Sequence, residues 1–122
     1  MPWELDSDRP IYAQIVARLK HEIVSGFYPP GSRLPSVRDL AAQASVNPNT
    51  MQKAFTELER TGLIVTRRTS GRTVTEDTAL IEQVRSELAE LQISQFLTRM
   101  QHLGYQKDDS IRLLLAKKEE IS

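Results

Sequence analysis

The fold of this chain is decided by residues 36–58, which read SVRDLAAQASVNPNTMQKAFTEL. Ser36 is typical of a helix N-cap, because its hydroxyl can accept a hydrogen bond from the backbone N–H three residues on, where Asp39 stands. Asn47 and Pro48 repeat the signal as a cap and a first helical residue. The stretch therefore predicts two consecutive helices, the first of them short, joined by a tight turn.

The helix predicted from Pro48 has two unlike faces. Its apolar residues recur every three or four positions, the spacing of one buried face, and they are Met51, Ala54, Phe55 and Leu58. The other side is polar and consists of Asn49, Thr50, Gln52, Lys53, Thr56 and Glu57. Gly62 is expected to end the helix, since glycine is the usual residue after a helix C-terminus.

Another helix and a hairpin flank this pair. Residues 11–25 predict a helix that Pro10 opens and Gly26 closes, with an apolar face of Tyr12, Ile15, Val16, Leu19 and Ile23. After Gly62 the pattern becomes extended, because residues 63–68 and 72–75 are rich in β-formers and enclose the turn Thr69-Ser70-Gly71. Three helices followed directly by a β-hairpin make a winged helix-turn-helix.

The rest of the chain is expected to be helical. A long helical pattern covers residues 78–104, but its apolar stripe is not one clean heptad, so we expect a bend or a shift of face near residues 93–94. A last short helix is expected over residues 110–120. The sequence thus predicts a mainly α protein with a small β-hairpin: a winged helix-turn-helix domain over residues 1–75 and a short helical dimerisation tail over residues 76–122.

Composition argues against several classes of function. The chain has no Cys, and its two histidines, His21 and His102, are far apart, so thiolate chemistry, metal ligation and a cofactor are not expected. No apolar run approaches the ~20 residues of a membrane helix, and the N-terminus lacks the features of a signal peptide, so we expect a cytoplasmic protein. No nucleophile and base converge and no phosphate-binding glycine loop occurs, so an enzyme is not expected.

Charge is unevenly distributed along the chain. The formal net charge is zero, with 16 Lys and Arg against 16 Asp and Glu. Residues 33–75 nevertheless hold seven basic and three acidic residues, a net +4, which leaves −4 for the remainder. Nucleic-acid interfaces depend on Lys and Arg contacts to phosphate. Double-stranded DNA is therefore the expected partner, bound in a sequence-dependent way, and modest salt should strip the protein from random DNA.

Three segments resemble the GntR family of bacterial transcription regulators: residues 10–15 (PIYAQI), 30–41 (PGSRLPSVRDLA) and 58–64 (LERTGLI). Residues 46–54 (VNPNTMQKA) and the short tail are similar to the YtrA subfamily, in which two or so helices replace a full effector domain and mediate dimerisation. The resemblance implies a dimeric repressor that binds a palindromic operator and controls its own operon, often together with ABC-transporter genes.

The resemblance also implies which residues meet DNA. They lie at the start of the short helix, on the polar face of the next helix and at the wing tip, and they are Ser36, Arg38, Asn49, Thr50, Gln52, Lys53 and Gly71. The clustering of Arg67, Arg68 and Arg72 around the Ser-Gly turn favours phosphate contact by these three as well, and Arg33, Asn47 and Ser70 complete the expected DNA-binding set. Many family members have Arg where Pro48 and Gln52 stand here, so their guanine contacts are not carried over, and Gln52 suits adenine instead. Thr69 replaces a frequent wing glycine, so this turn position has lost its freedom for positive φ.

These residues also have ordinary interpretations. Arg38 would form a surface ion pair, the arginines of the hairpin would deter edge-to-edge aggregation, and the polar residues of the second helix of the pair would be plain surface. Asn47 is expected first as a helix cap, with contact to a phosphate as the alternative role of its side chain. Tyr12 and Phe55 are expected in the core. Trp3 is expected to pin the N-terminus, either onto its own domain or onto a partner subunit.

The tail is too small to enclose a typical ligand cavity of ~300–1,000 Å³ and also bury its own apolar faces. We expect a two-fold homodimer with DNA-binding domains about 34 Å apart, held by Leu88, Leu91, Phe96, Leu97, Met100, Leu103, Ile111, Leu114 and Leu115. The sequence identifies no small-molecule effector; one that acts on the protein would bind between domain and tail or at the dimer interface. The competing hypothesis, a protein-interaction module without operator binding, leaves the +4 charge unexplained.

Overall fold

The computed structural model describes the backbone of residues 3–121 and, within that range, the side chains of all residues but 119 and 121. Its elements follow in the order α1 (Ile11–Val24), α2 (Val37–Ala44), α3 (Pro48–Arg60), β1 (Ile64–Arg67), β2 (Gly71–Val74), α4 (Thr78–His102) and α5 (Lys107–Ile121). The predicted mainly helical fold with one hairpin is confirmed. No helix in this described range is long and apolar enough to cross a membrane.

The chain forms two compact units, which we call the winged domain, through Arg85, and the second unit, from Ser86 onward. The division falls inside α4, later than the expected boundary at 75/76. The first turns of α4 belong to the winged domain for two reasons. Ile81 is buried, and the Arg85 guanidinium donates two hydrogen bonds to the Val24 carbonyl at the end of α1, at 3.1 Å from Nε and 2.9 Å from Nη2.

Two side-chain caps set the starts of α2 and α3. Ser36 Oγ accepts a hydrogen bond from the Asp39 backbone N–H at 3.1 Å, and Asn47 Oδ1 accepts one from the Asn49 N–H at 2.8 Å. Pro48 is the first residue of α3, a position whose N–H would have no partner within the helix, so proline's missing N–H costs nothing there. Both predicted helix starts are confirmed.

The turn between α2 and α3 is closed by a residue in the left-handed region. Ser45 has φ 59°, and the Val46 N–H that follows donates to the Ala41 carbonyl at 3.0 Å. This satisfies the free carbonyls at the end of α2 and reverses the chain within a few residues. The helices are thereby held at the short spacing of a helix-turn-helix.

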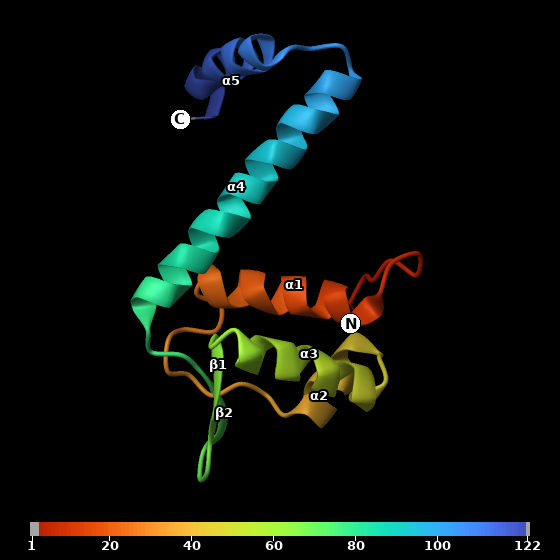
Figure 1. The fold of residues 1–122 in the computed structure, drawn as a ribbon, viewed down its shortest axis with the longest axis vertical. Coiled ribbons are helices and arrows are strands. Elements are labelled where there is room, and N and C mark those ends of the chain that lie inside the picture. Colours follow the sequence, from red (N-terminus) through yellow and green to blue (C-terminus); the bar gives the residue numbers. More distant parts are fainter. Residues whose placement is uncertain (1–2, 122) are drawn as a thin grey trace. The chain divides into compact units, whose positions relative to one another are not determined.

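The core of the winged domain lies where α3 packs against both α1 and α2, with the hairpin leaving the end of α3 (Figure 1). Side chains that are almost fully buried come from every one of these elements, and they include Ile15, Leu19, Ile23, Leu40, Met51, Phe55, Leu58, Leu63 and Val74. The predicted apolar face of α3 is confirmed in full. Tyr12 differs from expectation, because it is only half-buried.

The wing, residues 64–74, is an antiparallel hairpin in which Ile64 pairs with Val74 and Arg67 with Gly71. This register leaves residues 68–70 as the turn, and the positive φ of 72° falls on Gly71. The other edge of β2 is also paired, since the Val74 N–H donates to the Ser32 carbonyl at 2.9 Å. The wing is therefore held to the segment that leads into α2.

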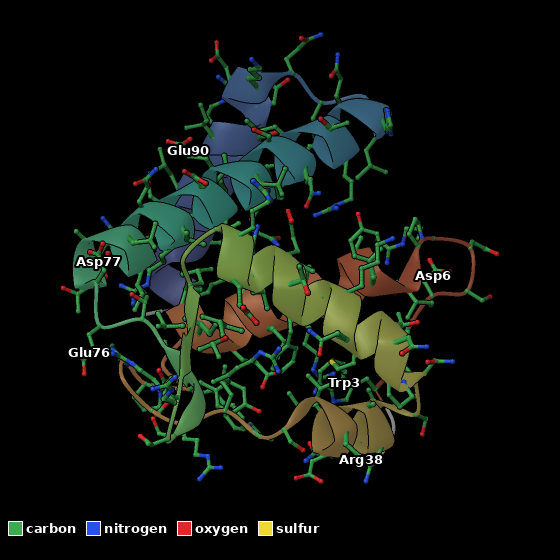
Figure 2. All side chains as sticks on the ribbon, turned by 60° about the horizontal axis from the view of Figure 1, so that its bottom comes forward. Trp3, Asp6, Arg38, Glu76, Asp77 and Glu90 are labelled. Carbon is green, nitrogen blue, oxygen red and sulfur yellow. The ribbon has the colours of Figure 1, made fainter. Side chains whose placement is uncertain are left out.

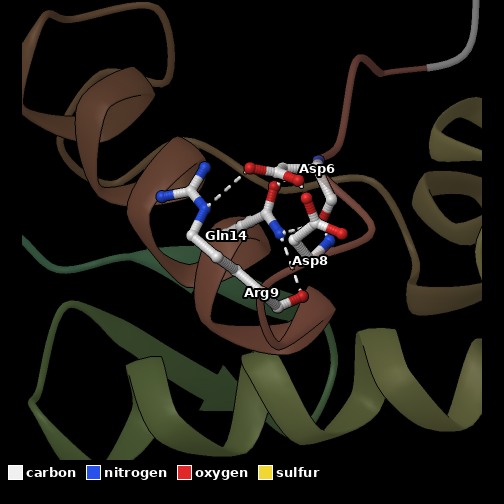
Figure 3. A network of polar contacts seen from close by, with 4 residues as sticks. All are labelled: Asp6, Asp8, Arg9 and Gln14. Atoms are coloured by element: carbon white, nitrogen blue, oxygen red, sulfur yellow. Dashed lines mark hydrogen bonds and ion pairs between the residues drawn. The ribbon is translucent and has the colours of Figure 1, made fainter.

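The N-terminal segment is fastened to α1. The Asp6 N–H donates to Gln14 Oε1 at 2.7 Å, and Gln14 Nε2 returns a hydrogen bond to the Asp6 carbonyl at 2.6 Å (Figure 3). Arg9 Nε donates to Asp6 Oδ2 at 3.2 Å. Ahead of this network, Trp3 is half-buried and its ring lies 4.2 Å from the guanidinium carbon of Arg18. Trp3 thus contacts its own domain.

Replacing Trp3 by Ala is expected to lower the free energy of unfolding by about 1 kcal/mol, the usual size of a partly exposed cation–π contact. The oligomeric state should not change, because the ring lies on α1 of its own chain. Thermal unfolding followed by circular dichroism and sedimentation velocity measure the two quantities. A variant of unchanged stability that dissociates would instead place Trp3 at a subunit interface.

In the second unit, α4 runs uninterrupted through the point where a bend or shift of face is expected. Leu88 is half-buried, Leu91 and Ile93 are exposed, and the next half-buried residues are Phe96, Leu97 and Met100. At about 100° per residue this last group lies on a different side of α4 from Leu88. The pattern agrees with a shift of face rather than a break.

Helix α5 begins at Lys107, not at Ser110 as the sequence indicates. The reason is that Gln106 occupies the cap position. Its N–H donates to Asp109 Oδ2 at 3.2 Å, and its carbonyl accepts from the Ser110 N–H at 3.1 Å. The acidic residues expected before the helix therefore form its first turn, where they favour the helix dipole.

Candidate nucleic-acid interface

The exposed face of α3 carries the polar residues that the sequence assigns to it. Asn49, Gln52 and Lys53 are exposed and Thr50 is half-buried, while the opposite face is packed into the core. Asn47 is exposed too, but its side-chain oxygen caps the helix, as expected. The first half of α3 therefore offers amides, a hydroxyl and an ammonium on a rigid helix.

Gln52 has a neighbour that the sequence did not single out as a site residue. Its Nε2 donates to Thr56 Oγ1 at 3.3 Å, and that hydroxyl donates to the Gln52 carbonyl at 3.0 Å. Both residues are exposed, one helical turn apart. The contact orients the Gln52 amide along α3, and the four-residue spacing on the polar face is the signal that points to Thr56.

Lys53 is directed back toward α1. Its ammonium nitrogen lies 4.1 Å from the centroid of the Tyr12 ring, within the range of a cation–π contact. Tyr12 therefore presents its ring to a cation on α3, although the sequence places it in the core. Any contact of Lys53 with a nucleic acid competes with this interaction.

We call residues 33–75, with their net charge of +4, the basic segment. Four of its arginines are exposed and form no ion pair with the described acidic side chains. They are Arg33, Arg38, Arg67 and Arg68. Arg38 lies on α2 one position after its first residue (Figure 2). Arg67 ends β1, and Arg68 begins the turn of the wing. Their charge is not neutralised within this part of the chain, which favours contact with an anion.

Two other arginines of the segment are paired with acids of α3. Arg60 donates from Nη2 to Glu57 Oε1 at 2.6 Å, and Arg72 donates from Nε to Glu59 Oε1 at 2.6 Å. The hydrogen bond from Arg60 holds the pKa of the Glu57 carboxyl below its usual value. Arg60 and Arg72 therefore differ from the four exposed arginines, since each already has an intramolecular partner.

A groove of about 680 Å³ connects the start of α2 with the wing, and its lining includes Arg33, Ser36, Gly71 and Arg72. Four of the residues that the sequence assigns to the interface are thereby brought to one concave surface. Tyr28 also lines it, and burial, helped by the negative charge of Glu22, raises the pKa of its hydroxyl. Besides these hydroxyls and guanidinium groups, the lining includes one acid, Asp39.

The second unit exposes many large apolar side chains. In α5, Ile111, Leu113, Leu114 and Leu115 are between 44% and 63% exposed, and Leu103, at the loop after α4, is 73% exposed. Leu113 and Ile93 are exposed members that the sequence did not assign to the dimer contacts. A set of this kind is typical of a surface that another chain covers.

The described residues contain no group of three or more His, Cys, Asp or Glu side chains able to hold a metal ion. His21 and His102 are both exposed.

Comparison with known proteins identifies relatives of the whole arrangement. Residues 11–74, from α1 to the end of the wing, match the family model for bacterial regulatory proteins of the gntR family. The HTH-type transcriptional repressor YtrA of Bacillus subtilis is 40% identical over 100 residues, which cover 80% of this chain and 76% of that protein.

Solved structures extend the likeness. A GntR family transcriptional regulator from Listeria monocytogenes superposes with a TM-score of 0.82 and 41% identity, covering 92% of this chain and 98% of that one. AraR(DBD) in complex with operator ORX1 superposes with a TM-score of 0.52 and 26% identity over 62% of this chain and 92% of that one. The latter match is to a domain seen on its operator DNA.

Proposed function

The chain belongs to the GntR family of bacterial regulatory proteins and is a YtrA-like DNA-binding transcriptional regulator, not an enzyme, and on that premise we propose that it is a dimeric repressor of a palindromic operator. The repressor role is supported by the similarity to the repressor YtrA. Its own operon, together with transporter genes, is the proposed target. Because that target is DNA, we place the protein in the cytoplasm.

The observation that carries the proposal is the contrast among the arginines of the basic segment. Arg33, Arg38, Arg67 and Arg68 are exposed and have no acidic partner among the described residues. They come from the segment that leads into α2, from α2 itself and from the wing, which precede and follow α3 in the chain. Duplex DNA supplies phosphates along both strands, so arginines on either side of a helix in the major groove can meet the backbone. The ion pairs of α3 involve Arg60 and Arg72, so the four exposed arginines remain able to bind phosphate.

We assign base reading to the first half of α3. Asn49, Thr50 and Gln52 would face the edges of the bases, with Gln52 pairing to adenine through a donor and an acceptor on one amide. The hydrogen bond to Thr56 supports this role, since it restricts the rotation of that amide. Lys53 would contribute less to the affinity for DNA, because its ammonium group loses the cation–π contact with Tyr12 when it moves to a phosphate.

Phosphate contacts are assigned to the start of α2 and to the wing. Ser36 and Arg38 would bind the backbone beside the major groove, while Arg67, Arg68, Ser70 and Gly71 would follow the neighbouring groove or strand. The groove between these two elements supports the assignment, as Arg33 and Ser36 share it with Gly71. Such contacts orient the domain, and α3 supplies the sequence preference.

Dimerisation is assigned to the second unit. Its exposed leucines and isoleucines would be covered by the same unit of a second chain, giving two winged domains that read half-sites about 34 Å apart. Any small-molecule effector is proposed to bind at this dimer interface or beside the winged domain.

Arg38→Ala should weaken operator binding by about tenfold or more, because a charged contact to DNA is lost in each subunit. The operator is first obtained by selecting duplexes from a random pool with the wild-type chain, and affinity is then measured by fluorescence anisotropy at several salt concentrations. Arg60→Ala is the matched control. It removes the same charge from the C-terminal end of α3 and should change affinity less than twofold.

The same experiment separates the two classes of function. Wild-type binding should fall steeply as salt rises, since each phosphate contact releases counterions. A response that stays flat from low to moderate salt, with no preferred duplex, would favour a protein-interaction module. If the wild-type chain prefers one duplex but Arg38→Ala and Arg60→Ala bind it with equal affinity, Arg38 does not contact the DNA.

A further inference from the structure

Arg72 of the wing is held by the helix that reads DNA. Its Nε donates to Glu59 Oε1 of α3 at 2.6 Å, across 13 residues of sequence. Its guanidinium carbon also lies 5.3 Å from the ring centroid of Phe55, which is fully buried on the same helix. The Arg72 and Glu59 side chains are 27% and 33% exposed, so solvent reaches this contact only in part.

The backbone of the same residue joins two further segments. Arg72 pairs with Thr66 in the hairpin register, and its carbonyl accepts from the Leu34 N–H at 2.9 Å. Residue 72 is therefore tied to β1, to the segment leading into α2 and to α3. The Arg72 side chain makes the tie to α3, through the ion pair with Glu59 and the contact with the Phe55 ring.

We propose that Arg72 is a positioning residue, which sets the wing against α3 through Glu59 instead of binding DNA itself. The inference rests on the proposed DNA-binding function. A two-stranded hairpin is barely stable by itself, so its orientation depends on what it is fastened to. Arg67 and Arg68, at its tip, meet a phosphate only when the wing stands at the correct angle to α3.

The two roles of Arg72 predict opposite effects for Glu59. If Arg72 bound phosphate directly, Glu59 would compete with the DNA for it, and Glu59→Ala would strengthen binding. If Arg72 positions the wing, Glu59→Ala weakens binding even though it removes a negative charge beside the DNA. The sign of this change distinguishes a tether from a contact.

The test compares Arg72→Ala, Glu59→Ala and the double variant on the selected operator. Each single variant should bind about tenfold more weakly, and the double variant should be no weaker than either single one, since both remove one interaction. Both singles should lower the dependence of affinity on salt equally, and hydroxyl-radical footprints should lose protection only where the wing lies. The matched control is Arg60→Ala with Glu57→Ala, which removes an ion pair internal to α3 and should change affinity less than twofold.

A charge exchange provides the rescue. Arg72→Glu combined with Glu59→Arg rebuilds the pair in reverse and should recover most of the affinity that Arg72→Glu loses alone. Thermal unfolding of each variant establishes that it is folded, and Glu59→Asp, which keeps the charge but shortens the arm, should also weaken binding. Tighter binding by Glu59→Ala, or affinities of all variants equal to wild type, would overturn the tether. A wild-type chain that prefers no duplex would overturn the proposed function instead.

Discussion

Leu115→Glu in α5 is expected to convert the proposed dimer into a monomer and to weaken operator binding by roughly 100-fold or more. Leu115 is 63% exposed in a single chain, so a charge there costs the isolated monomer little. In a dimer the same carboxylate would be buried without a partner, which is strongly unfavourable. A monomer also loses the gain from two linked DNA-binding domains, which reaches ~10²–10⁴ in affinity.

Sedimentation velocity at micromolar concentration measures the first effect, and anisotropy on the operator measures the second. Ala116→Glu is the matched control, because it adds the same charge to the same helix. Ala116 shares its side of α5 with the polar residues Arg112 and Glu120, four positions away on either side. The control should remain dimeric. A Leu115→Glu variant that sediments as a dimer, or a wild-type chain that sediments as a monomer, would contradict the assignment of α5 to the interface.

The helix starts of the winged domain could be predicted because their signals are local. Ser36 and Asn47 each cap a helix through a bond to a backbone N–H two or three residues away, so the residue type alone indicates the structure. The buried face of α3 was equally accessible, since helical spacing determines which side chains share a side.

Long-range pairs could not be predicted in this way. Arg72 and Glu59 meet across 13 residues, and Lys53 meets Tyr12 of another helix, because of how whole elements pack. The sequence shows which residues are basic and which are acidic, but it does not show which arginines form an ion pair with an acid of the same chain. For this reason the seven basic residues look alike in the sequence, whereas the structure distinguishes the arginines that pair with an acid of α3 from those that have no acidic partner among the described residues.

The point at which the winged domain ends also depends on a long-range contact. The sequence predicts a boundary at 75/76, because the hairpin pattern ends at residue 75 and a long helical pattern begins at residue 78. The first turns of α4 belong to the domain because Arg85 reaches the Val24 carbonyl, 61 residues away. A helix C-terminus leaves carbonyls that need donors, but nothing in the local sequence states that the donor for α1 comes from α4.

Phe55→Ala is expected to destabilise the winged domain by about 3–5 kcal/mol, the usual cost of removing a buried aromatic ring. Phe55 is fully buried on α3, the helix that contacts α1, α2 and β1. Small domains are stable by only ~5–15 kcal/mol, so the variant should unfold at far lower denaturant concentration. Urea unfolding followed by circular dichroism measures the shift in midpoint.

Thr56→Ala separates this effect from a general intolerance of α3 to substitution. Thr56 is the next residue, but it is exposed, and its hydroxyl bonds only within α3. Its removal should change stability by about 0.5 kcal/mol or less while altering the preference for the base that Gln52 reads. If Phe55→Ala cost less than about 1 kcal/mol, α3 would not depend on this ring for its packing. The position of α3 and of the wing would then depend on the Asn47 cap and on the ion pairs of Glu57 and Glu59. The pair between Arg72 and Glu59 would in that case contribute more to the stability of the domain than a partly exposed ion pair normally does.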